Sequence, residues 1–288
     1  MVEMNKKKVS NVLILILLFG SINLIELPSK CGRRINHSLL EYRIVGGDLS
    51  QINQWPWQVF INITVDFGLI AKQINCGGSI VNENWILTAA HCVPHFVRSG
   101  LKVNIEAIFG AVDLKNSNGI RRKVVRWLAH EKFDYVNKQN DIALMQLNES
   151  VSFDDNTKLA PICLSKLDHS KLRIPICYAT GFGFENRFFR QNDHQLRHVK
   201  ELIIDERKCR QYYPDINNST QICVDADLGG GHGTCLGDSG GPLQCFHTDK
   251  NRWYQIGLIS YGEPCALPET PDVFTKIEYF YDWILQQQ

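Results

Sequence analysis

The chain contains 288 residues, of which 44% are hydrophobic and 21% are charged. This is an ordinary globular composition, with enough material for one large core or two small ones. The 31 basic and 30 acidic side chains give a formal net charge of +1, which does not favour a polyanionic partner, and we expect no nucleic acid to bind.

The N-terminus has the pattern of a secretory signal peptide. Lysines at positions 6–8 precede an unbroken apolar run, Val12–Phe19, which is followed by small residues. The run is short for a membrane span, and Asn23 and Glu26 argue against a longer, uncleaved anchor. We therefore expect residues 1–25, with an approximate end, to be removed from a secreted, extracellular protein that has no stable membrane association.

Ten cysteines follow this export signal, and none of them forms a Cys-x-x-Cys pair. In an oxidising compartment, such cysteines are typical of disulfides and not of metal ligands. Spacing alone leaves the connectivity open.

Beyond Ile44, short stretches rich in β-branched and aromatic residues alternate with turns. A first group covers Trp57–Val65, Gly78–Thr88, Val103–Gly110, Val124–Leu128 and Ile142–Leu147. A second group covers Ile176–Gly181, His198–Ile204, Pro242–Phe246, Tyr254–Tyr261 and Asp272–Ile277. Short strands at this spacing predict an all-β barrel or sandwich. The tail, Lys276–Gln288, has apolar residues on one helical face and predicts a helix packed on that β-structure.

Two motifs in the first group contain residues suited to catalysis. Leu87-Thr88-Ala89-Ala90-His91-Cys92 places a histidine among small residues. Further along, Asp141 begins an alternating apolar stretch that ends at Leu147. Either residue alone is more often an ordinary surface or core residue, so the interpretation depends on a third motif.

That third motif is Gly237-Asp238-Ser239-Gly240-Gly241-Pro242-Leu243. Glycines allow unusual backbone conformations and close approach to a ligand, and backbone N–H groups near a serine hydroxyl can bind the oxyanion of an acyl-transfer intermediate. The run also satisfies the Gly-x-Ser-x-Gly turn of α/β hydrolases, in which the acid and the histidine follow the serine. Here the only histidine after Ser239 is His247, which is too close in sequence to return from a separate loop.

The order His91, Asp141, Ser239 is that of chymotrypsin-like proteases. With three motifs in this order, the chain resembles the chymotrypsin/trypsin-like secreted serine protease family over residues 44–288. The resemblance implies an all-β fold of two six-stranded antiparallel β-barrels of the chymotrypsin type with a C-terminal helix, and a serine endopeptidase that hydrolyses peptide bonds.

The resemblance also implies a role for each residue of the triad. Ser239 attacks the scissile carbonyl, His91 transfers the proton, and Asp141 orients the imidazole. The backbone N–H groups of Gly237 and Ser239 form the oxyanion hole.

Arg43-Ile44-Val45-Gly46-Gly47 resembles the activation site of the family, which implies an inactive zymogen. Cleavage after Arg43 frees the Ile44 amine to pair with the carboxylate of Asp238, because a buried charge needs a partner. Residues 26–43 are then a propeptide, or light chain, tethered by Cys31.

The family pattern carried onto this sequence gives five disulfides. They are Cys31–Cys163, Cys76–Cys92, Cys177–Cys245, Cys209–Cys223 and Cys235–Cys265.

The specificity pocket departs from the pattern of the family. Its base, six residues before the nucleophile, is Gly233 where trypsin has aspartate, and Asp272 replaces the usual glycine of the wall. Ser260, Tyr261 and Gly262 match the segment that pairs with the substrate backbone, and Thr234 completes the pocket. Because an ionised Asp272 attracts Arg or Lys but narrows the pocket, we expect a mixed preference for basic and apolar residues. The alternative is that Asp272 points to solvent.

Lys138, three residues before Asp141, is expected near the neighbouring subsites.

No metal or cofactor is expected. Two pairs of histidines have the four-residue spacing of zinc ligands on a helix: His91 with His95, and His194 with His198. Neither pair is accompanied by the glutamate of a metalloprotease motif. We therefore expect these histidines to be solvated. The expected calcium loop, 111–120, has only one carboxylate, Asp113.

The expected partners are protein or peptide substrates, an activating protease and protein protease inhibitors, and we expect a monomer. A non-catalytic protease homologue that binds a partner is the alternative function, although such proteins commonly lose a triad residue. A lipase or esterase is disfavoured by the triad order.

Five sequons mark glycosylation candidates: Asn36, Asn62, Asn148, Asn217 and Asn218.

Overall fold

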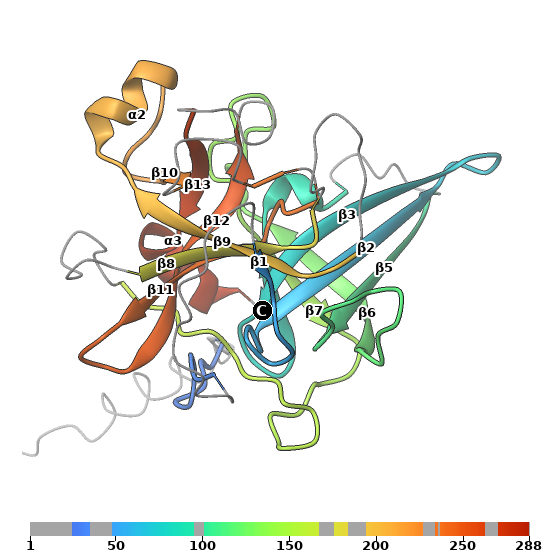
Figure 1. The fold of residues 1–288 in the computed structure, drawn as a ribbon. Coiled ribbons are helices and arrows are strands. Elements are labelled where there is room, and N and C mark those ends of the chain that lie inside the picture. The colour runs from blue at the N-terminus through green and yellow to red at the C-terminus, as the bar shows by residue number, and fades with distance from the viewer. Residues whose placement is uncertain are drawn as a thin grey trace, which may run out of the picture.

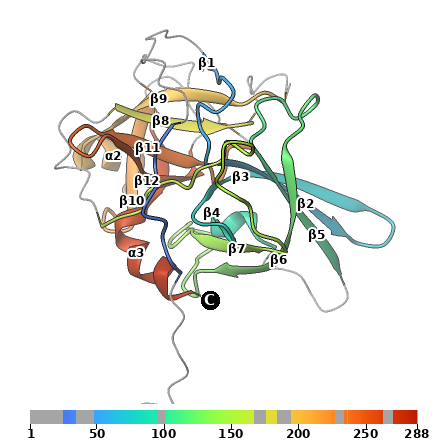
Figure 2. The ribbon, with the colours of Figure 1, turned by 90° about the horizontal axis from the view of Figure 1, so that it is seen from below.

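The computed structural model describes residues 25–34, 48–94, 101–166, 176–183, 194–226, 234–235, 237–262 and 270–287. Two antiparallel β-barrels lie side by side, as the two views in Figures 1 and 2 show. This arrangement confirms the predicted fold of two six-stranded barrels with a C-terminal helix.

The first barrel is a closed ring of six strands in the order β2-β3-β4-β7-β6-β5. Its strands are β2 (Gln58–Asp66), β3 (Ala71–Ile80), β4 (Trp85–Thr88), β5 (Lys102–Phe109), β6 (Ile120–Ala129) and β7 (Ala143–Leu147). The sequence of β2 explains why this strand lines the barrel. Val59, Ile61, Ile63 and Val65 alternate along it and are 0% exposed, because alternate residues of a strand face the same side.

The second barrel contains β8 (Ile176–Gly181), β9 (Arg197–Ile203), β10 (Gln221–Ala226), β11 (Pro242–His247), β12 (Arg252–Tyr261) and β13 (Asp272–Lys276). Their order is β9-β10-β13-β12-β11-β8, and pairing between β8 and β9 closes the ring. The two-residue strand β1 (Asp48–Leu49) adds to β9.

The C-terminal helix α3 (Ile277–Gln286) buries Ile277, Phe280 and Ile284, so the predicted tail helix is confirmed. The short helix α2 (Glu206–Tyr212) was not predicted; the Asp205 carboxylate caps it by accepting hydrogen bonds from the N–H groups of Arg207 and Lys208. No helix among the described residues is long and apolar enough to cross a membrane.

Several parts of the strand prediction were wrong. The stretch predicted as one strand, Gly78–Thr88, is broken between β3 and β4, where the side-chain Oδ1 of Asn82 accepts hydrogen bonds from the N–H groups of Asn84 and Trp85 and makes a turn. The first seven residues of β3, the first four of β6 and the whole of β1 and β10 were missed. His198 is also not solvated: it lies on β9 with its ring 5.6 Å from that of Trp55, and burial lowers its pKa to about 4.

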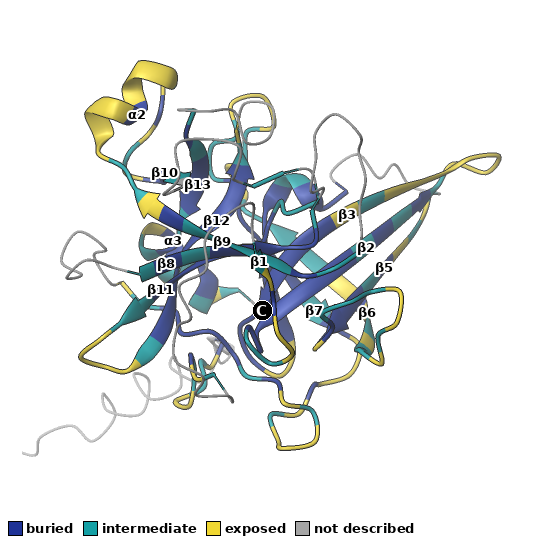
Figure 3. Ribbon diagram, in the orientation of Figure 1, coloured by how far each residue is buried: buried dark blue, intermediate teal, exposed yellow. Residues whose placement is uncertain are grey.

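Buried polar side chains join the two barrels. The Ser79 hydroxyl donates to Gln255 Oε1 over 2.6 Å, and the Thr180 hydroxyl donates to Gln58 Oε1 over the same distance. Buried polar groups are tolerated when they are hydrogen-bonded in this way. Figure 3 shows that burial is concentrated where the barrels meet, whereas α2 and the tip of the β2–β3 hairpin are exposed. The relative position of the barrels is therefore fixed, which matters for a site built from both.

The segment 25–34 packs against the body of the protein. Its Ile25 N–H donates to the Leu285 carbonyl over 2.8 Å, and Gly32 exchanges backbone hydrogen bonds with Pro161 and Trp253. Ile25, the last residue of the predicted signal peptide, is only 5% exposed.

Disulfides link Cys31–Cys163, Cys76–Cys92, Cys177–Cys245 and Cys209–Cys223. These are four of the five pairs that the resemblance implies. Cys235 is also disulfide-bonded, and its expected partner, Cys265, lies outside the described residues.

Candidate active site

His91 and Asp141 are joined by two hydrogen bonds. His91 lies in the 3-10 turn η1 (Ala90–Cys92) directly after β4, and Asp141 lies just before β7. The His91 backbone N–H donates to Asp141 Oδ1 over 2.8 Å, and ring atom Nδ1 lies 2.7 Å from Asp141 Oδ2. Because β4 pairs with β7, the fold of the first barrel brings the two residues together.

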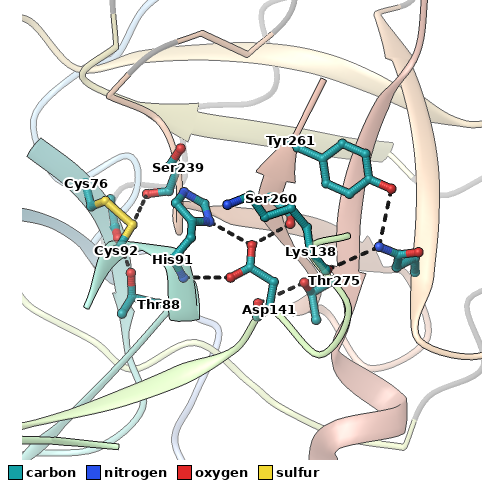
Figure 4. A network of polar contacts seen from close by, with 12 residues as sticks. Cys76, Thr88, His91, Cys92, Lys138, Asp141, Ser239, Ser260, Tyr261 and Thr275 are labelled. Atoms are coloured by element: carbon teal, nitrogen blue, oxygen red, sulfur yellow. Dashed lines mark hydrogen bonds and ion pairs between the residues drawn. A yellow bond between two sulfur atoms is a disulfide. The ribbon is translucent and has the colours of Figure 1, made fainter. Parts of the chain in front are cut away.

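The second barrel holds the same carboxylate. The Ser260 hydroxyl of β12 donates to Asp141 Oδ2 over 2.5 Å, and the Thr275 hydroxyl of β13 donates to the Asp141 carbonyl oxygen over 2.9 Å. Figure 4 shows both contacts. Asp141 is 0% exposed, so its orientation is set from both barrels.

Burial alone would raise the pKa of Asp141, but the adjacent His91 and the hydrogen bonds from His91 and Ser260 outweigh burial and hold this pKa below its usual value. The carboxyl is therefore ionised at neutral pH and accepts at both oxygens. Nδ1 of His91 then carries a proton, which leaves Nε2 of the neutral ring free to accept one.

Ser239 lies on the opposite side of the imidazole from Asp141 (Figure 4). Its loop is tied to both barrels: the Ser239 carbonyl accepts from the Gly77 N–H over 2.8 Å, and the Gly240 N–H donates to the Ile259 carbonyl over 2.8 Å. The sulfur of Cys92, which is in a disulfide with Cys76 and has no proton, lies 3.5 Å from the Ser239 carbonyl oxygen.

The glycines beside Ser239 have conformations that other residues resist. Gly237 has φ +103° and Gly240 has φ +78°. A Cβ on Gly240 would lie 2.2 Å from the Thr88 hydroxyl oxygen, so a side chain there would push the loop away from the first barrel. Gly237 and Ser239, the predicted oxyanion donors, thus stand in a loop whose shape requires glycine.

The Asp238 carboxyl is held by the backbone of two other segments. Its Oδ1 accepts from the Gly183 N–H over 2.7 Å, and its Oδ2 accepts from the Cys235 N–H over 2.9 Å. A Cβ on Gly181 would lie 1.9 Å from Asp238 Oδ1, so Gly181 leaves room for the carboxyl. Burial raises the pKa of Asp238 to about 6, against the opposing effect of these hydrogen bonds.

Asp272 does not point to solvent. Its Oδ2 accepts from the Thr234 hydroxyl over 2.7 Å and from the Thr234 N–H over 3.1 Å. A Cβ on Gly262 would lie 2.0 Å from Asp272 Oδ1, so the carboxyl lies directly against the Gly262 backbone. Burial raises the pKa of Asp272 to about 6 despite the hydrogen bonds from Thr234. Three of the six predicted pocket residues are thus in contact.

A groove of about 930 Å³ runs beside Tyr261. Lys138 lines this groove. Its ammonium group lies 3.8 Å from the ring centroid of Tyr135. The nitrogen of the Gln221 side-chain amide lies 3.4 Å from both the Lys138 carbonyl oxygen and the Tyr261 hydroxyl, and so links two residues that line the groove. The other lining residues come from the loop before β7 and from the end of α2 and the loop after it: Val136, Asn137, Gln139, Tyr212, Tyr213, Pro214, Asp215, Ile216 and Asn217.

Several predicted site residues lie outside the described part of the chain: Arg43, Ile44, Asn36 and Gly233. Other residues of the site were missed at the sequence level. Thr275 was given no role, and Gly181 and Gly183, which frame the Asp238 carboxyl, lie in the sequence Thr180-Gly181-Phe182-Gly183. That pair of glycines directly after an apolar strand was the available signal.

Comparisons with known proteins agree with this geometry. A family model described as Trypsin matches residues 44–284. The chain is 33% identical to the proclotting enzyme of Tachypleus tridentatus over 272 residues, which cover 91% of this chain and 69% of that protein. It is 27% identical to coagulation factor XI of Bos taurus over 270 residues, which cover 93% of this chain but only 40% of that protein.

Proposed function

The chain belongs to the trypsin family of serine proteases, and on that premise we propose that it is a secreted serine endopeptidase made as a zymogen. The observation that carries this proposal is the double hydrogen bond between Asp141 and His91, with Ser239 across the imidazole. An oriented imidazole with a free Nε2 beside a serine hydroxyl is the arrangement that activates a nucleophile.

The mechanism follows from these positions. His91 removes the proton of the Ser239 hydroxyl as the oxygen attacks the scissile carbonyl, and Asp141 stabilises the resulting imidazolium. The N–H groups of Gly237 and Ser239 stabilise the oxyanion. His91 then donates the proton to the leaving amine, and water hydrolyses the acyl-enzyme.

Labelling with a serine-directed phosphonate tests this proposal. The chain cleaved at Arg43 is expected to be labelled at Ser239 and the uncleaved chain is not. Equal labelling of both forms contradicts the zymogen part, and no labelling of either form supports the alternative of a non-catalytic homologue. The retention of His91, Asp141 and Ser239 favours the enzyme.

We propose that protein or peptide substrates, an activating protease and protein inhibitors are the partners of a monomeric protein. Two of its relatives are called a proclotting enzyme and a coagulation factor, which supports a role in proteolytic activation of other proteins.

We propose glycosylation at Asn148 and Asn217, which are exposed. The side-chain nitrogen of Asn218, to which a glycan would attach, is buried, and Asn62 lies within β2 with its side-chain oxygen buried. A glycosidase-sensitive mass shift that is lost in N148Q and N217Q checks this assignment.

After cleavage at Arg43, the light chain is expected to stay attached through Cys31–Cys163. On denaturing gels, the activated protein should run as one species without reductant and as two species with it. Cys31→Ser should release the light chain in both conditions. Release from the unmutated protein without reductant would contradict the tether.

Asp272 is proposed to give the pocket its affinity for basic residues. Asp272→Gly should lower kcat/KM for substrates with Arg or Lys before the scissile bond by about 10- to 150-fold, the equivalent of about 1.5–3 kcal/mol for a hydrogen bond to a charged group. Apolar substrates should be cleaved at least as well, because the pocket widens. In the unmutated enzyme, preference for basic residues should fall as the pH drops through about 6, where Asp272 takes up a proton. Peptide-library profiling of both enzymes measures this, and an unchanged preference would reject it.

A further inference from the structure

Glu201 is a buried carboxyl for which neither the fold nor the proposed mechanism provides a role. It lies in β9, is 1% exposed, and its Oε1 has no hydrogen-bond partner. Native proteins rarely bury a polar atom without a partner, and each such atom calls for an explanation. An apolar side chain at this position would pack without that disadvantage.

The strand register places Glu201 on the same face as Asp272. Glu201 is opposite Cys177 of β8 and Ala226 of β10. Val224, two residues before Ala226 and therefore on the same face, is opposite Asp272 of β13. Cys177 and Val224 are both 0% exposed, so this face is the interior of the second barrel. Glu201 and Asp272 thus project into the interior from the two strands that flank β10.

The contacts of Asp272 connect Glu201 to the proposed specificity pocket. Asp272 bonds to Thr234 and lies against Gly262, both of which we assign to the pocket. Glu201 is linked to these residues through Asp272, whose charge acts on it.

The groups that act on Glu201 from the neighbouring strands are acidic or do not titrate. Asp272 of β13 and Asp225 of β10 are the described charges that influence it, and Cys177 of β8 is in a disulfide. Asp225 is paired with Lys208 of α2 at 3.0 Å. Burial, and then these two carboxylates, raise the pKa of Glu201 well above its usual value. Burial and the two carboxylates thus all favour the protonated form of Glu201.

We infer that Glu201 is a second specificity-determining carboxyl, which gives up its proton to solvent when a cationic side chain occupies the pocket beside Asp272 and keeps it when an apolar side chain does. A nearby cation favours the ionised form of an acid, whereas an apolar side chain offers no such compensation. This inference rests on the proposed function. It explains how one pocket accepts both classes of residue: one ionised carboxylate is present when an apolar side chain is bound, and two are present when a basic side chain is bound.

Calorimetry with benzamidine, a cationic pocket ligand, tests the inference. The activated full-length enzyme is titrated at pH 8, where Asp272 is already ionised, in two buffers of different ionisation enthalpy. Release of a substantial fraction of one proton per benzamidine is expected from the unmutated enzyme and none from Glu201→Gln, which has the same shape. Glu83→Gln, an exposed glutamate of the first barrel, is the control and should release as much as the unmutated enzyme.

Kinetics give a second measurement. E201Q should lower kcat/KM for substrates with Arg before the scissile bond by about tenfold, in keeping with the loss of one charge-assisted interaction, and leave apolar substrates within about twofold. Equal proton release from the unmutated enzyme and from folded E201Q overturns the inference. The absence of proton release from the unmutated enzyme also overturns it, and that result does not require E201Q to fold. Failure to bind benzamidine in an enzyme that cleaves apolar substrates also overturns it, while phosphonate labelling shows separately that the serine protease proposal stands.

Discussion

Asp141→Asn is expected to lower kcat of the activated enzyme by about 10⁴-fold while leaving the fold intact. The carboxylate accepts from the His91 backbone N–H, from ring atom Nδ1 and from the Ser260 hydroxyl. An asparagine in the same position can accept at only one of its two side-chain atoms. Its NH₂ group, placed against Nδ1, would require Nδ1 to accept, so the proton would move to Nε2. The imidazole would then present a donor to Ser239 where a base is needed.

The measurement is kcat on a peptide substrate after cleavage at Arg43, together with the melting temperature. Asp113→Asn is the control, because Asp113 is a partly exposed acid whose carboxylate accepts hydrogen bonds from its own loop, and it should keep full activity. A loss of less than about tenfold in D141N, with the chain folded, would mean that Asp141 does not orient His91 during catalysis.

The triad motifs could be recognised in the sequence because each carries its own local context. The contacts that support the triad could not be recognised in the sequence. Ser260 and Thr275 are 119 and 134 residues from Asp141 in the sequence, and a hydroxyl side chain in a strand carries no signal that it will meet a carboxylate. Only the closure of the second barrel against the first brings them together.

The strands were predicted where alternation was strong and missed where it was weak. In β2, four interior residues alternate with more polar ones, which is typical of a half-buried strand. In β10, the sequence Gln221-Ile-Cys-Val-Asp-Ala has three consecutive apolar residues after a buried glutamine. It becomes a strand through its pairing with β9 and β13, which is a property of the whole barrel.

Glu201 shows the same limit for a single residue. An acidic residue in the sequence of β9 would ordinarily be expected to face solvent. Its burial depends on β8 and β10, which cover it from both sides. We thus infer one carboxyl beside the specificity pocket that the sequence did not lead us to expect.

Asp238→Asn is expected to keep the cleaved chain in a zymogen-like state, with kcat/KM lower by about 10²- to 10⁴-fold. Among the described residues of the uncleaved chain, the Asp238 carboxyl has the N–H groups of Gly183 and Cys235 as its hydrogen-bond partners, and burial raises its pKa to about 6. Because this pKa lies above the usual value, the contribution of Asp238 to stability is fully present below about pH 4 and is lost as the pH rises through about 6. At neutral pH the uncleaved chain thus holds a buried carboxylate that no described cation neutralises. Cleavage supplies the Ile44 ammonium, and breaking such a buried pair typically costs about 3–5 kcal/mol.

Two measurements on the same samples separate this switch from simple misfolding. Cleavage should raise the melting temperature of the unmutated protein at pH 8, because the new ammonium neutralises Asp238, and should leave that of D238N nearly unchanged. Uncleaved D238N should remain folded at that pH, because the amide has no charge to desolvate, although it can accept only one of the two hydrogen bonds from the Gly183 and Cys235 N–H groups. N-terminal sequencing that begins at Ile44 shows that D238N was cleaved. If cleaved D238N reacts with the phosphonate as fast as the cleaved unmutated protein, the Ile44 amine does not act through Asp238. A rate close to that of the uncleaved chain supports an activation switch in the residue next to the nucleophile.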